Sequence, residues 1–219
     1  MKHFLSHVSA VALLWALACS PPGGAAEFVP APQRDLSQTG SVATVVLAGG
    51  CFWCVEAVFE PVRGVTKVVS GYAGGDAASA RYDQVSAGRT DHAEAVQVTY
   101  DPRQVSYGKL LQIFLSTHDP TQKDRQGPDR GRQYRSAIFY ATEAERDIAA
   151  AYLRQLTEAG TFAQPIVTTL EPLTRFYPAE EYHQDYAARH PQDPYVRAWV
   201  PAKLAKLRTH FPDQLAAGQ

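Results

Sequence analysis

Gly49-Gly50-Cys51-Phe52-Trp53-Cys54-Val55-Glu56 joins a strand pattern to a helix pattern and decides the fold of this 219-residue chain. An apolar, β-branched run at residues 44–48 precedes it, and apolar residues at helical spacing follow it up to Phe59. The two glycines predict a turn between strand and helix. Cys51 then lies at the first helical turn, where unpaired backbone N–H groups favour negative charge. We therefore expect Cys51 to ionise easily and to be a good thiolate.

Cys54 follows Cys51 by three residues, so both lie on one helix face and are close enough to form a disulfide. An isolated cysteine is usually a core residue, and a packed Cys54 remains the alternative to a resolving thiol. Half of a zinc site is a second alternative, but zinc needs about four ligands and the sequence has no second C-x-x-C and no paired histidines. The pair predicts redox or nucleophilic chemistry without a metal.

The composition is that of an ordinary globular chain, with 45% hydrophobic residues, 20% charged residues and a net charge of -1. Such a chain can bury one sizeable core. It has no basic excess, so we do not expect a nucleic-acid partner. Nothing in the pattern favours an oligomer, and we expect a monomer.

The N-terminal sequence has the pattern of an export signal. Lys2 leads into an apolar run at residues 8–18 that is too short to span a bilayer but has the length of a signal-peptide core. Two processing routes remain open: cleavage after Gly24-Ala25-Ala26, or a lipoprotein box that acylates Cys19 and anchors the chain in a membrane. Either route predicts export to the periplasm or cell envelope.

The chain divides into four segments. Residues 1–26 are the expected signal, and the proline- and glycine-rich residues 27–42 are an expected linker outside the fold. Residues 43–212 are the expected catalytic domain, and residues 213–219 an expected tail.

Within the domain the order of patterns predicts an α+β fold. Strands are expected at residues 44–48, 65–72, 92–100 and 135–140, with helices from residue 51, over 106–115 and over 143–156. This order is βαββαβ, the ferredoxin-like two-layer unit with helices packed on an antiparallel sheet. An additional C-terminal strand at residues 165–170, a last helix at 202–207 and a long structureless loop at 117–133 complete the expected fold.

Glu94 is the candidate proton donor. Strand alternation places it on the same face as the apolar residues Val96, Val98 and Tyr100. Burial disfavours the charged form of a carboxyl and prepares it to donate a proton. The alternative is a strand-end glutamate that points to solvent. We interpret His92, two residues earlier, as a hydrogen-bonded structural histidine.

Two further stretches are dense in polar groups. A loop as long as residues 117–133 is usually functional or disordered. Residues 176–184 combine aromatic rings with polar groups, which can close a small pocket. The alternative for both stretches is a solvated surface.

Together these segments resemble the A-type peptide methionine sulfoxide reductases. The matching segments occur in order over about residues 43 to 210, so the resemblance is specific. They are residues 50–56, 71–75, 92–96, 100–102, 118–121, 125–127, 129–136 and 182–186.

The resemblance implies reduction of the S-epimer of methionine sulfoxide, free or in proteins, without a metal or organic cofactor. It implies that Cys51 attacks the sulfoxide sulfur and that Glu94 protonates the oxygen. It further implies an apolar pocket for the substrate methyl group and polar groups that bind the oxygen. These are Phe52 and Trp53 for the pocket, and Tyr82, Asp129 and Tyr134 for the oxygen.

The chemistry agrees with these roles, because a sulfoxide oxygen leaves poorly unless it is protonated. Attack leaves Cys51 as a sulfenic acid, which a second thiol converts into a disulfide. Many members carry a recycling cysteine after a C-terminal tyrosine, but here Val196 follows Tyr195. We therefore expect a Cys51–Cys54 disulfide that a thioredoxin-like dithiol reduces. Asp91 occupies a position where glycine is common.

Two other classes of protein compete with this interpretation. An exported thioredoxin-type dithiol-disulfide oxidoreductase also has a C-x-x-C at a helix start, but it would turn over no sulfoxide. The Phe-Trp pair between the cysteines and the segments around Glu94 and Tyr134 disfavour it. A non-catalytic envelope binding module is the third class, and it would have no activity on methionine sulfoxide.

Overall fold

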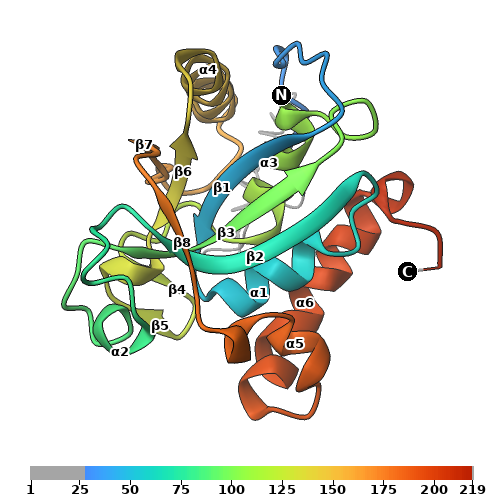
Figure 1. The fold of residues 1–219 in the computed structure, drawn as a ribbon. Coiled ribbons are helices and arrows are strands. Elements are labelled where there is room, and N and C mark those ends of the chain that lie inside the picture. Colours follow the sequence, from blue (N-terminus) through green and yellow to red (C-terminus); the bar gives the residue numbers. More distant parts are fainter. Residues whose placement is uncertain (1–27, 219) are drawn as a thin grey trace, which may run out of the picture.

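The computed structural model describes residues 28–218, in which a six-stranded sheet is covered by helices (Figure 1). The expected signal at residues 1–26 and its Cys19 lie outside the described residues. No helix in the described part of the chain is both long enough and apolar enough to cross a membrane.

The sheet has the strand order β7-β6-β1-β3-β2-β8. Its neighbours pair antiparallel, except for the parallel pair β6 and β7. The strands are β1 Ala43–Gly49, β2 Val65–Ala73, β3 Ala93–Tyr100, β6 Ser136–Tyr140, β7 Thr169–Pro172 and β8 Phe176–Pro178. The α+β class expected from the sequence is confirmed.

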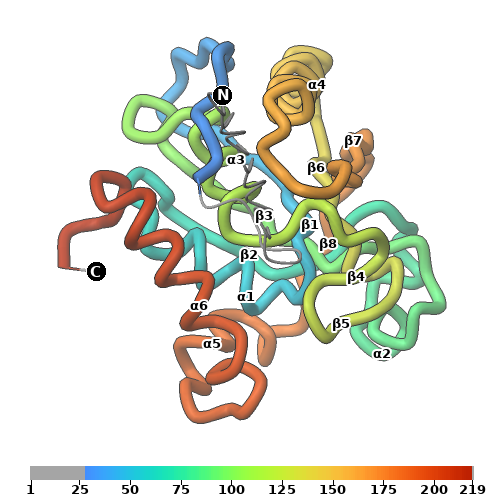
Figure 2. The backbone as a smooth tube through the Cα atoms, turned by 180° about the vertical axis from the view of Figure 1, so that it is seen from behind, coloured from blue at the N-terminus to red at the C-terminus, as the bar shows by residue number. Residues whose placement is uncertain are grey.

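One face of the sheet carries the main core. Alternation along β1 turns Val45 and Leu47 toward the helices, whereas Val46 and Ala48 face a smaller apolar cluster on the other side. Helix α6 packs on both α1 and α3 over the main core (Figures 1 and 2). The helices are α1 Phe52–Phe59, α2 Tyr82–Val85, α3 Tyr107–Thr117, α4 Glu143–Glu158, α5 Tyr186–Arg189 and α6 Pro194–His210.

Side-chain caps fix where the long helices begin. Thr142 forms a capping box with Glu145 at the start of α4. Asp193 accepts hydrogen bonds from two backbone N–H groups at the start of α6, and Pro194 occupies its first position. The last helix therefore starts well before residue 202, where we expected it, and continues through Pro201.

The loop at residues 117–133 is not structureless, contrary to our expectation. It contains the short hairpin of β4 Arg125–Gln126 and β5 Asp129–Arg130, followed by a 3-10 turn, Arg132–Tyr134. Gly127, between the strands, has φ 58°, which favours glycine. The strand expected at 165–170 is also displaced, because β7 begins only at Thr169.

The segment before β1 packs on the domain, so our expectation that it lies outside the fold was wrong. Val29 is buried, and its carbonyl accepts a hydrogen bond from Gln112 Nε2. Asp35 accepts the Gly108 N–H at 2.7 Å. At the other end, Leu215 forms a β-bridge with Val62, so the start of the expected tail is also bound to the domain.

Candidate active site

Gly50 forms the turn that places Cys51 at the start of α1. Its φ is 98°, a conformation that glycine adopts readily, and a Cβ there would meet Gln126 at 2.5 Å. Cys51 follows as the N-cap of α1 and is 8% exposed. The glycine turn expected from the sequence therefore positions the first thiol.

The two thiols lie close together, and each affects the ionisation of the other. Burial raises the pKa of Cys51 well above its usual value, and the backbone N–H of Trp53 only partly opposes this rise. The Cys51 thiol in turn lowers the pKa of Cys54, although burial opposes this effect, and the Lys203 ammonium lowers it further. The expectation of an easily ionised Cys51 was wrong for the substrate-free site, because desolvation outweighs the helix terminus.

Glu94 is buried next to Cys51, not turned to solvent. It is 2% exposed, and its Oε2 accepts the Phe52 backbone N–H at 3.1 Å. Burial raises its pKa to about 8, while the Phe52 hydrogen bond opposes the rise. Because ordinary carboxyls ionise near pH 4, this one keeps its proton at neutral pH.

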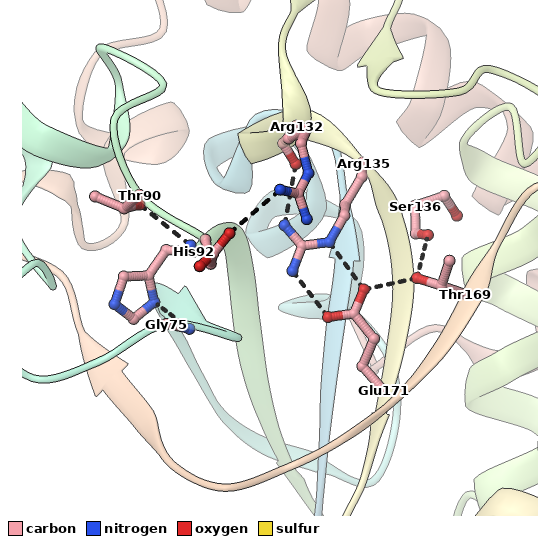
Figure 3. Close-up of polar contacts among 9 residues, drawn as sticks. Gly75, Thr90, His92, Arg132, Arg135, Ser136, Thr169 and Glu171 are labelled. Carbon is pink, nitrogen blue, oxygen red and sulfur yellow. Dashed lines mark hydrogen bonds and ion pairs between the residues drawn. The ribbon is translucent and has the colours of Figure 1, made fainter.

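His92 has the structural role that we expected. Its Nδ1 accepts the Gly75 N–H at 3.2 Å (Figure 3). Its Nε2 lies 2.8 Å from the Asp76 carbonyl oxygen. The ring thus ties the end of β2 to the start of β3. Asp91 forms an exposed ion pair with Arg132 at 3.2 Å, and such surface pairs contribute little to stability.

Phe52 and Trp53 lie at the base of an aromatic cluster. Phe52 is 1% exposed, and Trp53 stacks on Tyr186 with ring centroids 3.7 Å apart and an interplanar angle of 10°. Trp53 Nε1 donates a hydrogen bond to His183 Nδ1 at 3.1 Å. The expected apolar residues are therefore fixed by side chains from the C-terminal part of the chain.

Tyr82 and Tyr134 approach Cys51 and Glu94 from two other segments. The Tyr82 backbone N–H donates to Glu180 at 2.9 Å. Tyr134 ends the 3-10 turn. Burial raises the pKa of both phenols, and the charge of Glu94 raises it further, to about 12 for Tyr82. Both hydroxyls therefore stay protonated and can donate hydrogen bonds.

The position after Tyr134 anchors this turn to the sheet. Arg135 is buried, and its Nη2 lies 2.8 Å from Oε2 of Glu171 on β7 (Figure 3). Arg135 Nη1 also donates to the carbonyl oxygen of Arg132 at 3.1 Å. A guanidinium that binds a carboxylate with two nitrogens fixes orientation as well as position.

Asp129 lies on the Cys54 side of the site. It accepts a hydrogen bond from the Tyr195 hydroxyl. A cavity of about 210 Å³ reaches both cysteines there, and Phe52, Trp53, Tyr82 and Tyr134 are not among its lining residues. The residues that line this cavity include Cys51, Cys54, Asp129, Tyr195, Trp199 and Lys203.

Sequence reasoning missed four residues that complete the site. His183 and Tyr186 lie in a segment that the family resemblance had included, so a signal was present. Tyr195 and Lys203 come from α6. The sequence analysis named Tyr195 only as the residue before Val196, and no local pattern marks Lys203. The Lys203 side chain is held at the end of α3, because its Nζ donates a hydrogen bond to the Thr117 carbonyl oxygen at 3.2 Å.

A pair of neighbouring thiols beside a carboxyl that stays neutral defines the class as a thiol-dependent oxidoreductase. The family model described as "Peptide methionine sulfoxide reductase" matches residues 43–215. The chain belongs to the peptide methionine sulfoxide reductase family, whose members are oxidoreductases that act on methionine sulfoxide.

Relatives of known sequence and structure agree with this membership. The chain is 50% identical to peptide methionine sulfoxide reductase MsrA 2 of Synechocystis, over 87% of this chain and 92% of the relative. It is 52% identical to MsrA of Thermus thermophilus, over 77% and 95%. Reduced Mxr1 from Saccharomyces cerevisiae has a TM-score of 0.64 at 33% identity, with 73% of this chain and 92% of that one covered. Methionine sulfoxide reductase A of Corynebacterium diphtheriae has a TM-score of 0.61 at 36% identity, with 71% and 78% covered.

Proposed function

We propose that the enzyme reduces the S-epimer of methionine sulfoxide, free or in proteins, and so repairs oxidised proteins. The observation that carries the proposal is the burial of a neutral Glu94 beside Cys51, joined to it through the Phe52 N–H. A thiol and a proton donor thereby converge on the position that one S=O bond would occupy.

In the proposed reaction, Cys51 Sγ attacks the sulfoxide sulfur as a thiolate while Glu94 gives its proton to the oxygen. Attack forms a bond between Sγ and the substrate sulfur, and the protonated oxygen becomes a hydroxyl group on that sulfur. The hydroxyl group then moves to Sγ as the sulfur–sulfur bond and the substrate S–O bond break, so that methionine leaves and Cys51 remains as a sulfenic acid. Glu94 contributes a second effect, since a neutral carboxyl does not repel the Cys51 thiolate. The Tyr82 and Tyr134 hydroxyls, both protonated, bind the oxygen, and the aromatic cluster around Trp53 holds the methyl group.

The Asp129 carboxylate already accepts the Tyr195 hydroxyl. We propose that Asp129 acts on the sulfoxide oxygen from the Cys54 side, together with Tyr195.

Recycling is proposed to use Cys54. Its sulfur attacks the sulfur of the Cys51 sulfenic acid, which releases water and forms a Cys51–Cys54 disulfide. A thioredoxin-like dithiol then reduces this disulfide and becomes oxidised itself. The position of both thiols at one cavity supports this step, as does the lowered pKa of Cys54. Val196, where many members keep a recycling cysteine, is buried and offers no thiol.

The proposal is tested by assaying the purified protein with separated epimers and a dithiol reductant. We expect turnover of the S-epimer alone and none in Cys51→Ser, whose fold is checked by circular dichroism. Equal reduction of both epimers, or full activity in the folded variant, would contradict it. Insulin disulfide reduction without sulfoxide turnover would instead favour the thioredoxin-type function.

We also propose that the centre of the sheet is the ferredoxin-like unit. The order β6-β1-β3-β2 supports it, because all three of these strand pairs are antiparallel and α1 and α3 make the two helical connections.

Export and a monomeric state are further proposals, supported by the apolar run at residues 8–18 and by the composition. Mass spectrometry of protein from the native envelope distinguishes cleavage after Ala26 from acylation of Cys19. Unprocessed Met1 in a cytoplasmic fraction would rule out export, and light scattering tests the monomer.

A further inference from the structure

Three carboxylates converge on the side of α1 away from the thiols. Glu56 and Glu60 lie one helical turn apart, and Asp185 precedes α5 with φ 53°. Each offers one oxygen, and these oxygens all lie within 4.8 Å of one another. Within residues 28–218, no lysine or arginine forms an ion pair with any of the three.

Glu56 makes this cluster unlike an ordinary acidic surface. It is 1% exposed, and neither carboxylate oxygen has a hydrogen-bond partner in the described part of the chain. The Asp185 backbone N–H and the Ser70 hydroxyl lie close enough to affect its ionisation but do not reach hydrogen-bond geometry. A buried carboxyl without a partner is costly, since it has lost its water.

Like charges add to this cost. Two glutamates at i and i+4 of one helix destabilise it, and the third carboxylate repels both. Burial raises the pKa of Glu56 and of Glu60 to about 7, and Asp185 adds to the rise at Glu60. Lys67 lines the same cavity as Glu60 and Asp185 but forms no ion pair with either, so a proton or a bound cation would stabilise the three carboxylates.

We propose that Glu56, Glu60 and Asp185 form a binding site for a hard divalent cation, with Ca²⁺ as the best fit. Carboxylate oxygens are the ligands that Ca²⁺ prefers, and a separation of up to 4.8 Å fits across its shell, whose radius is about 2.4 Å. A cavity of about 680 Å³ lined by Glu60 and Asp185 leaves room for water ligands. Mg²⁺ is a poorer fit, because it demands a tighter, near-ideal octahedron.

The cation would join α1 to the segment that holds Trp53. Glu56 lies in α1, which Cys51 precedes, and Glu60 is the C-cap of the same helix. Asp185 lies between His183 and Tyr186, which fix Trp53. Binding would therefore hold the aromatic cluster against α1. Sulfoxide chemistry is not needed for the site, so it stands or falls independently of the proposed reaction.

Calorimetric titration of chelator-treated protein with CaCl₂, together with thermal unfolding, tests the proposal. We expect one Ca²⁺ per chain and a rise in Tm of roughly 5 to 10 °C at about a hundredfold excess over Kd. Glu60→Gln, an exposed position, should abolish both responses. Glu181→Gln removes a charge at the same cavity but outside the cluster, so it should keep both.

Glu56→Gln separates cation binding from misfolding. It should raise the Tm of the metal-free protein, because a buried charge is removed, and should abolish the calcium response. The proposal is overturned if CaCl₂ neither binds nor shifts Tm in the wild type, as expected for a shared proton. Equal responses in Glu60→Gln and Glu181→Gln, or a larger shift with MgCl₂, would overturn it as well.

Discussion

The backbone N–H of Phe52 donates to Glu94 Oε2 across 3.1 Å, which fixes the helix that carries the nucleophile to the strand that carries the acid. The bond uses one of the unpaired N–H groups at the start of α1, so it satisfies a helix terminus and a buried carboxyl together. Cys51 and Glu94 therefore keep their relative positions before substrate arrives.

Glu94→Gln should lower sulfoxide reduction by about 10² or more, the usual effect of a positioned acid. Glutamine has the same shape and can still accept the Phe52 N–H, but it delivers no acidic proton. The measurement is steady-state turnover of the S-epimer, with unfolding followed in parallel. A folded variant with nearly wild-type turnover would leave Glu94 a structural role only.

Glu94 should make the free energy of unfolding decrease as pH rises. Its folded pKa of about 8 exceeds the unfolded value of about 4.3, so the folded state holds a proton that the unfolded state loses. The contribution of Glu94 is complete below pH 4 and is lost as pH rises through 8. Denaturant unfolding from pH 4 to 9 should show a weaker dependence in Glu94→Gln. An unchanged profile would mean that Glu94 is ionised in the native protein.

Cys54→Ser should reduce one equivalent of sulfoxide and then stop or recycle slowly with a thioredoxin-like donor. In wild type, one equivalent should consume both thiols, because the sulfenic acid condenses with Cys54. Thiol counting after a single turnover makes the distinction. If wild type retains a free Cys54, or if the variant recycles at the wild-type rate, Cys54 is only a packed helix residue.

Lys203→Met should slow the reaction of Cys54 with iodoacetamide several-fold near neutral pH. The ammonium lowers the Cys54 pKa, so its removal leaves less thiolate. Arg208→Met, an exposed charge on the same helix, is the matched control and should change little. The alkylation rate is measured against pH in a Cys51→Ser background. Identical profiles in all three proteins would show that Lys203 does not act on Cys54.

Local pattern was sufficient for much of this site. Glu94 could be assigned to the core face from the alternation of β3, and Cys51 to a helix start from its glycines. The helix over residues 143–156 was predicted in the same way, and α4 spans Glu143–Glu158. Each of these features depends on residues within a few positions of one another.

Other features depended on segments distant in sequence. Cys51 is hard to ionise because the whole fold buries it, including side chains of α6 that no local pattern connects to it. The hairpin β4 to β5 was hidden within a charged stretch. We expected the last helix to begin only after Pro201, whereas the start that Asp193 and Pro194 provide carries α6 through this proline.

The residues that surround Trp53 and the thiols are synthesised long after Trp53 itself. His183 lies 130 positions after Trp53, and Lys203 comes later still. Until α6 has left the ribosome, it cannot cover the apolar side of α1 or the thiol of Cys54. An oxidant that meets the nascent chain then finds two neighbouring cysteines without an active site around them. Completion of the C-terminal helix is therefore the event that turns a vulnerable thiol pair into a protected one.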